Sequence, residues 1–215
     1  MVTLGIIGVV SAMTVPSLMQ NYQRQSYVTQ LHKVYNEMQQ AIVQYQTDRN
    51  AVNLTEAGLT SNAAIQSFIK SYFKVIKECE ELEGCFASDY KILNGGSANF
   101  GKLKSFVLAS GASIRPTLNA SDGDIGVYFA VDVNGPKGPN IGGRDMFTMR
   151  YYNDGSIDVY TVTPECRTDE TKCNDNYGST PIEKREIRYS QVCVTSANGD
   201  DCIGKLLNDN WIMNY

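Results

Sequence analysis

Six cysteines are the residues of this chain whose type and spacing most directly suggest chemistry. They fall into three near pairs, which are Cys79 with Cys85, Cys166 with Cys173, and Cys193 with Cys202. Zinc binding is disfavoured, because no C-x-x-C occurs and five, six and eight residues separate the members of the pairs. Six cysteines allow fifteen connectivities, and we expect disulfides within the near pairs. Structural disulfides indicate an oxidising compartment outside the cytoplasm.

A loop rich in glycine, asparagine and aspartate is the second candidate for chemistry. Residues 132–145 read Asp-Val-Asn-Gly-Pro-Lys-Gly-Pro-Asn-Ile-Gly-Gly-Arg-Asp. Oxygen ligands for calcium would come from this loop and from just before it: Asp132, Asn134 and Asp145 first, with Asp122, Asp124 and Asn140. The spacing is not that of an EF-hand, and two prolines and the lack of Gly-Lys-Ser/Thr argue against a P-loop. We therefore favour a structural β-connection whose residues take unusual backbone dihedrals.

Residues for catalysis are scarce. The single histidine, His32, has no second ligand or base one turn away, so we expect a solvated helix residue. Neither G-x-S-x-G nor H-E-x-x-H occurs, and bridged cysteines are not nucleophiles. Arg144 beside Asp145 is interpreted as a local ion pair or a contact between subunits. We expect that the protein is not an enzyme and needs no cofactor.

Composition narrows the classes of partner. The chain has 215 residues, of which 42% are hydrophobic and 20% charged, and this excludes a disordered chain. The net charge of −4 and the absence of any Lys/Arg run argue against nucleic acid as a partner.

The chain begins with an uncharged segment, which we expect to form the first part of a long helix. Residues 1–19 carry no charge, and the first charged side chain is Arg24. A helix of this length would span roughly 28 Å, close to the ~30 Å hydrocarbon core of a bilayer. A signal peptide, a buried core helix, a transmembrane anchor and a helix packed in a filament are the four interpretations. A secretory signal normally opens with positive charge, which this segment lacks.

One apolar stripe continues the helix beyond this segment. Its members recur at steps of three and four residues: Tyr27, Leu31, Val34, Met38, Ala41 and Tyr45. The spacing predicts a single helix over Leu4–Thr47, roughly 65 Å long, apolar all round at first and amphipathic later. Pro16 lies inside it and is expected to kink or locally melt it.

The remaining sequence predicts a helical segment and then strands. Residues 64–76 have helical spacing, and Ser61 or Asn62 is suited to cap their N-terminus. Strand-like segments and turn signals follow, with strands at 104–109, 112–115, 126–133, 146–152 and 156–162, and turns at 110–111 and 153–155. Helices followed by three or four strands indicate an α+β head whose antiparallel sheet the long helix covers.

The segment from Cys166 to Tyr215 contains two of the three cysteine pairs. Its apolar residues are expected to form a short closing helix, comprising Ile203, Leu206, Leu207 and Trp211. We expect Trp211 to be buried against the sheet, and an exposed binding aromatic is the alternative.

From residue 4 the chain reads Leu-Gly-Ile-Ile-Gly-Val-Val-Ser-Ala-Met-Thr-Val-Pro-Ser-Leu-Met-Gln-Asn-Tyr. This stretch, with its Ile-Gly step, small and branched residues, Pro16 and polar end at Tyr22, resembles the N-terminal helix of type IV pilins and type II secretion pseudopilins. The loop 132–145 is similar to one that recurs in pseudopilin-like heads. The aromatic first residue and the nearby glutamate of that family have no counterpart here. Aligned on Gly8 and Pro16, the chain begins a few residues downstream of both, so we expect the natural start to lie upstream.

The resemblance implies a pilin-like α+β fold, with residues 1–24 as the apolar half of the helix and residues 25–215 as a head with disulfide-stapled loops. It implies a structural subunit of a type IV pilus-like or type II secretion pseudopilus filament in the bacterial cell envelope. The implied partners are further copies of the chain, the assembly platform and, before assembly, the inner membrane, with the head outside the cytoplasm. Filament-core packing would involve Leu4, Ile6, Ile7, Val9, Val10, Met13, Val15, Pro16 and Leu18. The alternative is a membrane-anchored or secreted binding module, such as an adhesive minor pilin, whose tyrosine-rich head recognises an extracellular ligand.

Overall fold

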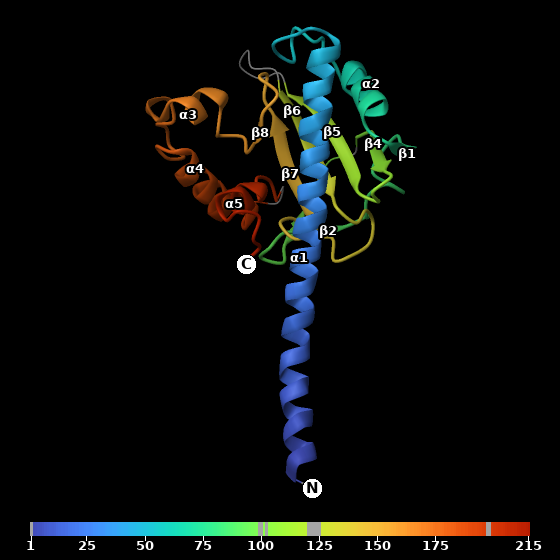
Figure 1. Cartoon of the computed structure of the whole chain (residues 1–215), viewed down its shortest axis with the longest axis vertical. Helices are drawn as coiled ribbons and strands as arrows, with labels where there is room; N and C mark the ends of the chain where they lie inside the picture. Colours follow the sequence, from blue (N-terminus) through green and yellow to red (C-terminus); the bar gives the residue numbers. More distant parts are fainter. Residues whose placement is uncertain (1, 99–100, 102, 120–125, 197–198) are drawn as a thin grey trace.

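A long helix projects from a head in which it packs against an antiparallel sheet (Figure 1). This computed structural model describes residues 2–98, 101, 103–119, 126–196 and 199–215, and of residues 2–14 and 17 it describes the backbone. The α+β class, the helix on an antiparallel sheet and the three disulfides confirm the coarse prediction.

Helix α1, Val2–Asp48, is one continuous element of 47 residues, close to the predicted Leu4–Thr47. It continues through Pro16, so the predicted local melting is wrong. Proline removes one backbone donor and its ring crowds the preceding turn, but the ladder on both sides of it persists. Within the described residues, no helix is both long enough and apolar enough to cross a bilayer, so the predicted transmembrane helix is not supported.

A sheet of six antiparallel strands, in the order β1-β4-β5-β6-β7-β8, forms the centre of the head. The strands are β1 (Val75–Cys79), β4 (Ser105–Leu108), β5 (Ser113–Asn119), β6 (Gly126–Asp132), β7 (Met146–Tyr151) and β8 (Ile157–Asp158). A separate two-stranded ladder joins β2 (Tyr90–Lys91) and β3 (Ser97–Ala98). The central strands lie where the sequence predicted them, but the expected three or four strands are too few.

Two element boundaries differ from the prediction. Helix α2 spans Asn62–Tyr72, capped by the Ser61 side chain, which accepts from the amide of Ala64. Phe73 then adopts an extended conformation, with φ −119° and ψ 150°, so the last predicted helical residues instead lead into β1. At the far edge, β8 keeps only two of the seven residues predicted for that strand.

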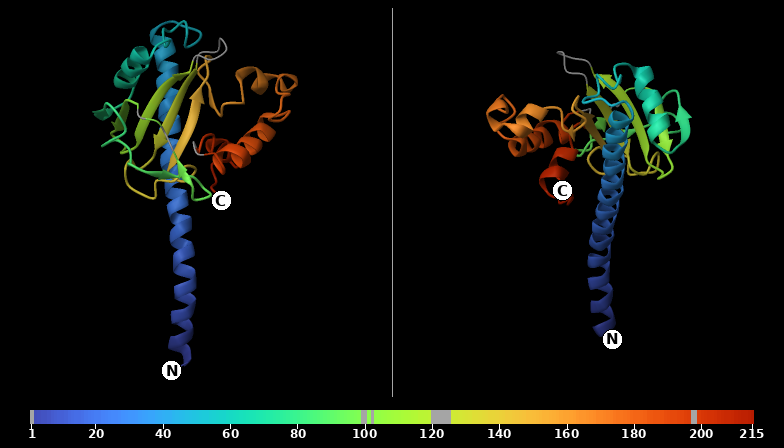
Figure 2. Two further views of the ribbon diagram at one scale, coloured as in Figure 1. Left: turned by 180° about the vertical axis from the view of Figure 1, so that it is seen from behind. Right: turned by 45° about the horizontal axis from the view of Figure 1, so that its top comes forward.

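The second half of α1 lies along the sheet beside α2 and forms the main core with it (Figures 1 and 2). Leu31, Met38 and Ile42 are at most 1% exposed. The Tyr151 hydroxyl of β7 donates to the backbone carbonyl of Met38 across 2.6 Å. This bond joins the central sheet directly to the helix, in addition to apolar packing.

The C-terminal region lies on the flank away from α2 (Figures 1 and 2). It contains short helical elements: α3 (Pro164–Thr168), η2 (Glu170–Lys172), α4 (Pro181–Arg188), η3 (Tyr189–Cys193) and α5 (Ile203–Asn208). All three predicted disulfides are present, namely Cys79–Cys85, Cys166–Cys173 and Cys193–Cys202. Two of them staple this region, in which regular structure is short.

Trp211 is half-buried and packs against the core as expected, but its ring contacts are with α1 and not with the sheet. Helix α5 ends at Asn208, and Asn210 and Trp211 have φ of 50° and 61°, which turn the chain toward α1. The indole stacks on His32 at 4.2 Å between ring centroids and meets Tyr35 edge-on at 5.0 Å. The tryptophan therefore fastens the C-terminal segment to the helix, and His32, exposed as predicted, has an aromatic partner.

Candidate functional site

The projecting part of α1 exposes apolar side chains. Val15, Leu18, Met19 and Tyr22 are 49%, 65%, 59% and 75% exposed. Of the predicted filament-core residues, Val15, Pro16 and Leu18 are thus free to contact a partner. The side chains of the other predicted members, Leu4, Ile6, Ile7, Val9, Val10 and Met13, lie outside the described residues. Scattered exposed apolar residues are ordinary, but a run of them on one projecting helix is typical of an interaction surface.

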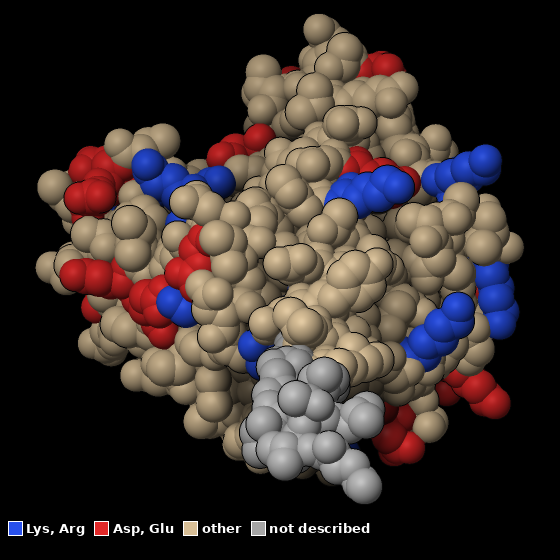
Figure 3. All heavy atoms as spheres, turned by 60° about the horizontal axis from the view of Figure 1, so that its bottom comes forward, with Lys and Arg blue, Asp and Glu red and all other residues tan. Residues whose placement is uncertain are grey.

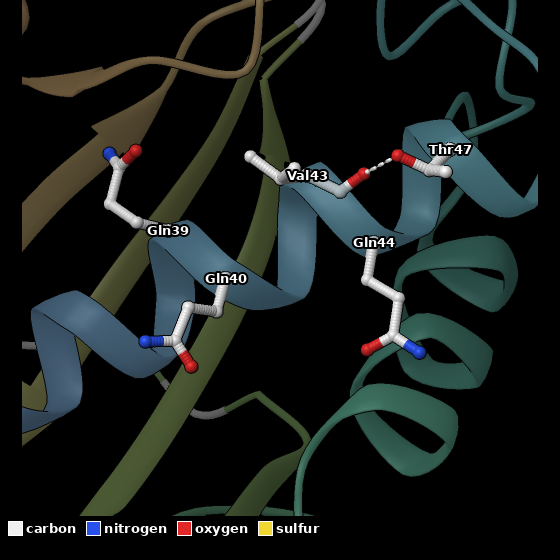
Figure 4. A pocket seen from close by; sticks show the side chains of 5 residues that line it. All are labelled: Gln39, Gln40, Val43, Gln44 and Thr47. Carbon is white, nitrogen blue, oxygen red and sulfur yellow. Dashed lines mark hydrogen bonds between the residues drawn. The ribbon is translucent and has the colours of Figure 1, made fainter.

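The outer face of α1 between Gln39 and Thr47 is polar yet uncharged. Gln39, Gln40, Val43, Gln44 and Thr47 line a shallow hollow of ≈ 480 Å³ (Figure 4). The Thr47 hydroxyl donates to the Val43 carbonyl at 2.8 Å. A side-chain amide is both donor and acceptor, so two copies of such a face can meet without like-charge repulsion.

The loop 132–145 contains a buried carboxylate, Asp132, at the end of β6. Its side chain accepts from the Tyr90 hydroxyl and from the amide of Asn134, the latter at 3.1 Å. Burial raises the pKa of Asp132 to about 8, with the nearby charge of Asp145 acting in the same direction. Asp132 therefore anchors the β2 strand and its own loop through hydrogen bonds.

Asp145 anchors the other end of this loop. Its two carboxylate oxygens accept from the amides of Asn140 and Ile141 at 2.8 and 2.7 Å. Burial is the main cause that raises its pKa. Its oxygens are thus engaged by the loop backbone, and no ion pair with Arg144 is present among the described residues. The predicted local ion pair is therefore wrong.

The structure brings the predicted calcium residues Asp132, Asn134 and Asp145 into one loop, together with Asn140. The Asn134 amide donates to the Gly138 carbonyl at 3.1 Å. Within the described ranges, no three His, Cys, Asp or Glu side chains gather as a metal site would require. Asp122 and Asp124 lie outside those ranges. Because loop donors already engage both carboxylates, the geometry favours a structural role for this loop.

Close packing explains the glycines of the loop. Gly143 has φ +84°, and a Cβ there would lie 3.0 Å from the Sγ of Cys202. The backbone just before Gly143 pairs with Lys91 of β2: the Lys91 amide donates to the Asn140 carbonyl, and the Gly142 amide donates to the Lys91 carbonyl. The loop thus fits between the two-stranded ladder and the third disulfide, which supports the interpretation as a β-connection.

Comparisons with known proteins add nothing to this geometry. No family model, curated protein or solved structure matches the chain. Function must therefore be inferred from the surfaces themselves. The sequence pointed to the apolar helix half, but it did not reveal a cavity where the helix leaves the head, lined by Gln20, Gln23, Arg24, Tyr27, Gly138, Pro139, Arg144 and Met213. Its one sequence signal is Arg24, the first charge after the uncharged segment.

Proposed function

We propose that this chain is a structural subunit of a type IV pilus-like or type II secretion pseudopilus filament of the bacterial cell envelope. One observation carries the proposal: Leu18, Met19 and Tyr22 are largely exposed on a helix that extends beyond the head. In water these side chains gain nothing from folding, whereas burial against further copies would stabilise by ~25 cal/mol per Å² of apolar surface. The sequence resemblance to pilins and pseudopilins supports the same role.

The head is suited to form the outer wall of such a filament. It has its own core, built from the second half of α1, α2 and the sheet, so it does not need the projecting half for folding. In the view from the base, acidic and basic side chains are interspersed on both flanks, and a wide uncharged surface lies between the flanks (Figure 3). Identical copies can therefore approach around the helix with little like-charge repulsion.

The alternative binding module was based on the tyrosine-rich head. Several of these tyrosines belong to the interior of the head, since Tyr45, Tyr90, Tyr151 and Tyr152 are buried. Tyr160 and Tyr177, on the C-terminal flank, are 38% and 37% exposed, and both face Arg188. This distribution favours the filament over a ligand-binding aromatic surface.

Assembly of the purified chain tests the proposal. Removing residues 1–24 should leave a soluble, monomeric head, as measured by sedimentation and electron microscopy. Leu18→Asp should strongly reduce filament formation, because a charge would enter the apolar contact. Val52→Asp is the matched control, since Val52 is 81% exposed but lies outside the helix. Filaments formed by the truncated head, or equal assembly of the two aspartate variants, would contradict the proposal.

A further inference from the structure

Most arginines of the head have a partner within the fold. Arg167, Arg185 and Arg188 pair with the carboxylates of Asp154, Asp158 and Asp201. Arg49 lies over the Tyr45 ring at 3.7 Å and Arg150 over the Tyr152 ring at 4.8 Å. These contacts hold the five guanidinium groups against carboxylates or aromatic rings of the head.

Arg24 and Arg144 line the same cavity, where the helix leaves the head. The buried Nε atoms of both lack a hydrogen-bond partner, and neither side chain has an ion-pair partner in the described parts of the chain. Arg24 comes from α1, whereas Arg144 comes from the loop 132–145, 120 residues later. Two cations converge here without a carboxylate in the cavity lining.

The other lining groups add donors. Gln20 and Gln23 contribute side-chain amides and Tyr27 a hydroxyl, around a cavity of ≈ 410 Å³. The buried carboxylate of Asp145, next to Arg144 in the sequence, is engaged by backbone amides and makes no ion pair with either guanidinium group within the described residues. The cavity is thus rich in donors and positively charged.

We infer that this cavity binds a phosphate group, held between the guanidinium groups of Arg24 and Arg144. A guanidinium presents paired N–H donors that match the oxygens of a phosphate. A carboxylate has two oxygens and suits a single fork, whereas a phosphate has enough oxygens for two forks and the amides of Gln20 and Gln23. A free phosphate and the phosphate of a lipid headgroup share this chemistry, and the experiments below distinguish the two sources.

The cavity lies at the junction between the projecting half of α1 and the head, whichever source supplies the phosphate. From residue 18 onward, Val28 is the first buried residue of α1, so Arg24 and Tyr27 lie where the helix leaves the head. A phosphate bound there would link α1 to the loop 132–145. The inference does not depend on filament assembly, because the cavity is formed within one chain.

Titration of the full chain with inorganic phosphate tests the site. Calorimetry should show saturable binding, weakened about tenfold by Arg24→Gln or by Arg144→Gln and abolished in the double variant. Lys33→Gln is the matched control, since Lys33 is an exposed cation on the same helix outside the cavity. Its binding should equal that of the unaltered chain. Circular dichroism verifies that each variant is folded.

Flotation with vesicles distinguishes the two sources. If a lipid headgroup is the ligand, phosphatidylglycerol vesicles should retain the full chain better than phosphatidylcholine vesicles, and the double variant should lose that difference. Phosphate binding without a vesicle difference identifies a soluble phosphate as the ligand. The inference is overturned if the unaltered chain shows neither saturable phosphate binding nor a vesicle difference, or if the double variant behaves like the unaltered chain in both assays.

Discussion

The two halves of α1 belong to one continuous helix but have opposite surroundings. In the second half, Leu31 and Met38 are fully buried against the sheet, whereas in the first half Leu18 and Met19 are 65% and 59% exposed. The same residue types are therefore used for folding in one half and left available in the other. Helix formation alone does not explain the exposed half, because it has no sheet to cover. If the proposed function is right, the stability of the head and the association of copies reside in separate segments.

The largest effect is expected from replacing one leucine in each half of α1. The substitution in the buried half should lower the stability of the head, and the one in the exposed half should weaken assembly. Leu31→Ala should destabilise the head by about 2–5 kcal/mol, because it leaves a cavity in the core. Leu18→Ala should change the free energy of unfolding by less than about 0.5 kcal/mol and should weaken assembly. Denaturant titration and sedimentation of both variants measure this. Equal destabilisation by the two substitutions would contradict the view that only the second half of α1 stabilises the head.

Burial in the head also has a cost that depends on pH. Asp132 has a pKa of about 8 in the fold against 3.8 for an unperturbed carboxyl, with burial as the main cause. The folded state therefore binds more protons than the unfolded state between these values, and the free energy of unfolding should fall as pH rises through that window. Asp132→Asn should flatten this dependence in denaturant titrations at a series of pH values. A profile unchanged by the substitution would show that Asp132 ionises normally.

A smaller effect tests the bond between sheet and helix. Tyr151→Phe removes the hydroxyl that donates to the Met38 carbonyl at 2.6 Å and should cost about 1 kcal/mol. Tyr22→Phe is the control in the projecting half, where the side chain is 75% exposed, and should leave thermal unfolding of the head unchanged. A larger loss from Tyr22→Phe would mean that the projecting half contributes to folding of the head.

Periodicity and short-range spacing predicted the parts of this fold that depend on neighbours in sequence. The stripe through Leu31 and Met38, the cap at Ser61 and the turn at Gly155 were all predicted in this way, and Gly155 has a positive φ of 84° in that turn. Strand β1 was missed because it is short and mostly exposed, so it lacks a periodic apolar pattern.

Features that depend on contacts between distant segments could not be predicted. Trp211 stacks on His32 across 179 residues of chain, through two successive residues with positive φ that no pattern announced. The cavity around Arg24 and Arg144 combines the helix, a loop and the C-terminal segment, and only tertiary packing brings these together. For the loop 132–145, the sequence indicated unusual dihedrals, but not that Gly143 would approach a disulfide.

The three disulfides have a mechanical consequence. Each joins residues only six, seven or nine positions apart, so none connects one secondary structure layer to another. A pulling force between the N-terminal helix and the C-terminus would therefore bypass only these three short loops, because no disulfide crosslinks distant parts of the head. Nearly the whole polypeptide remains extensible, and resistance to stretching must come from shearing the strands and from detaching the helix from the sheet.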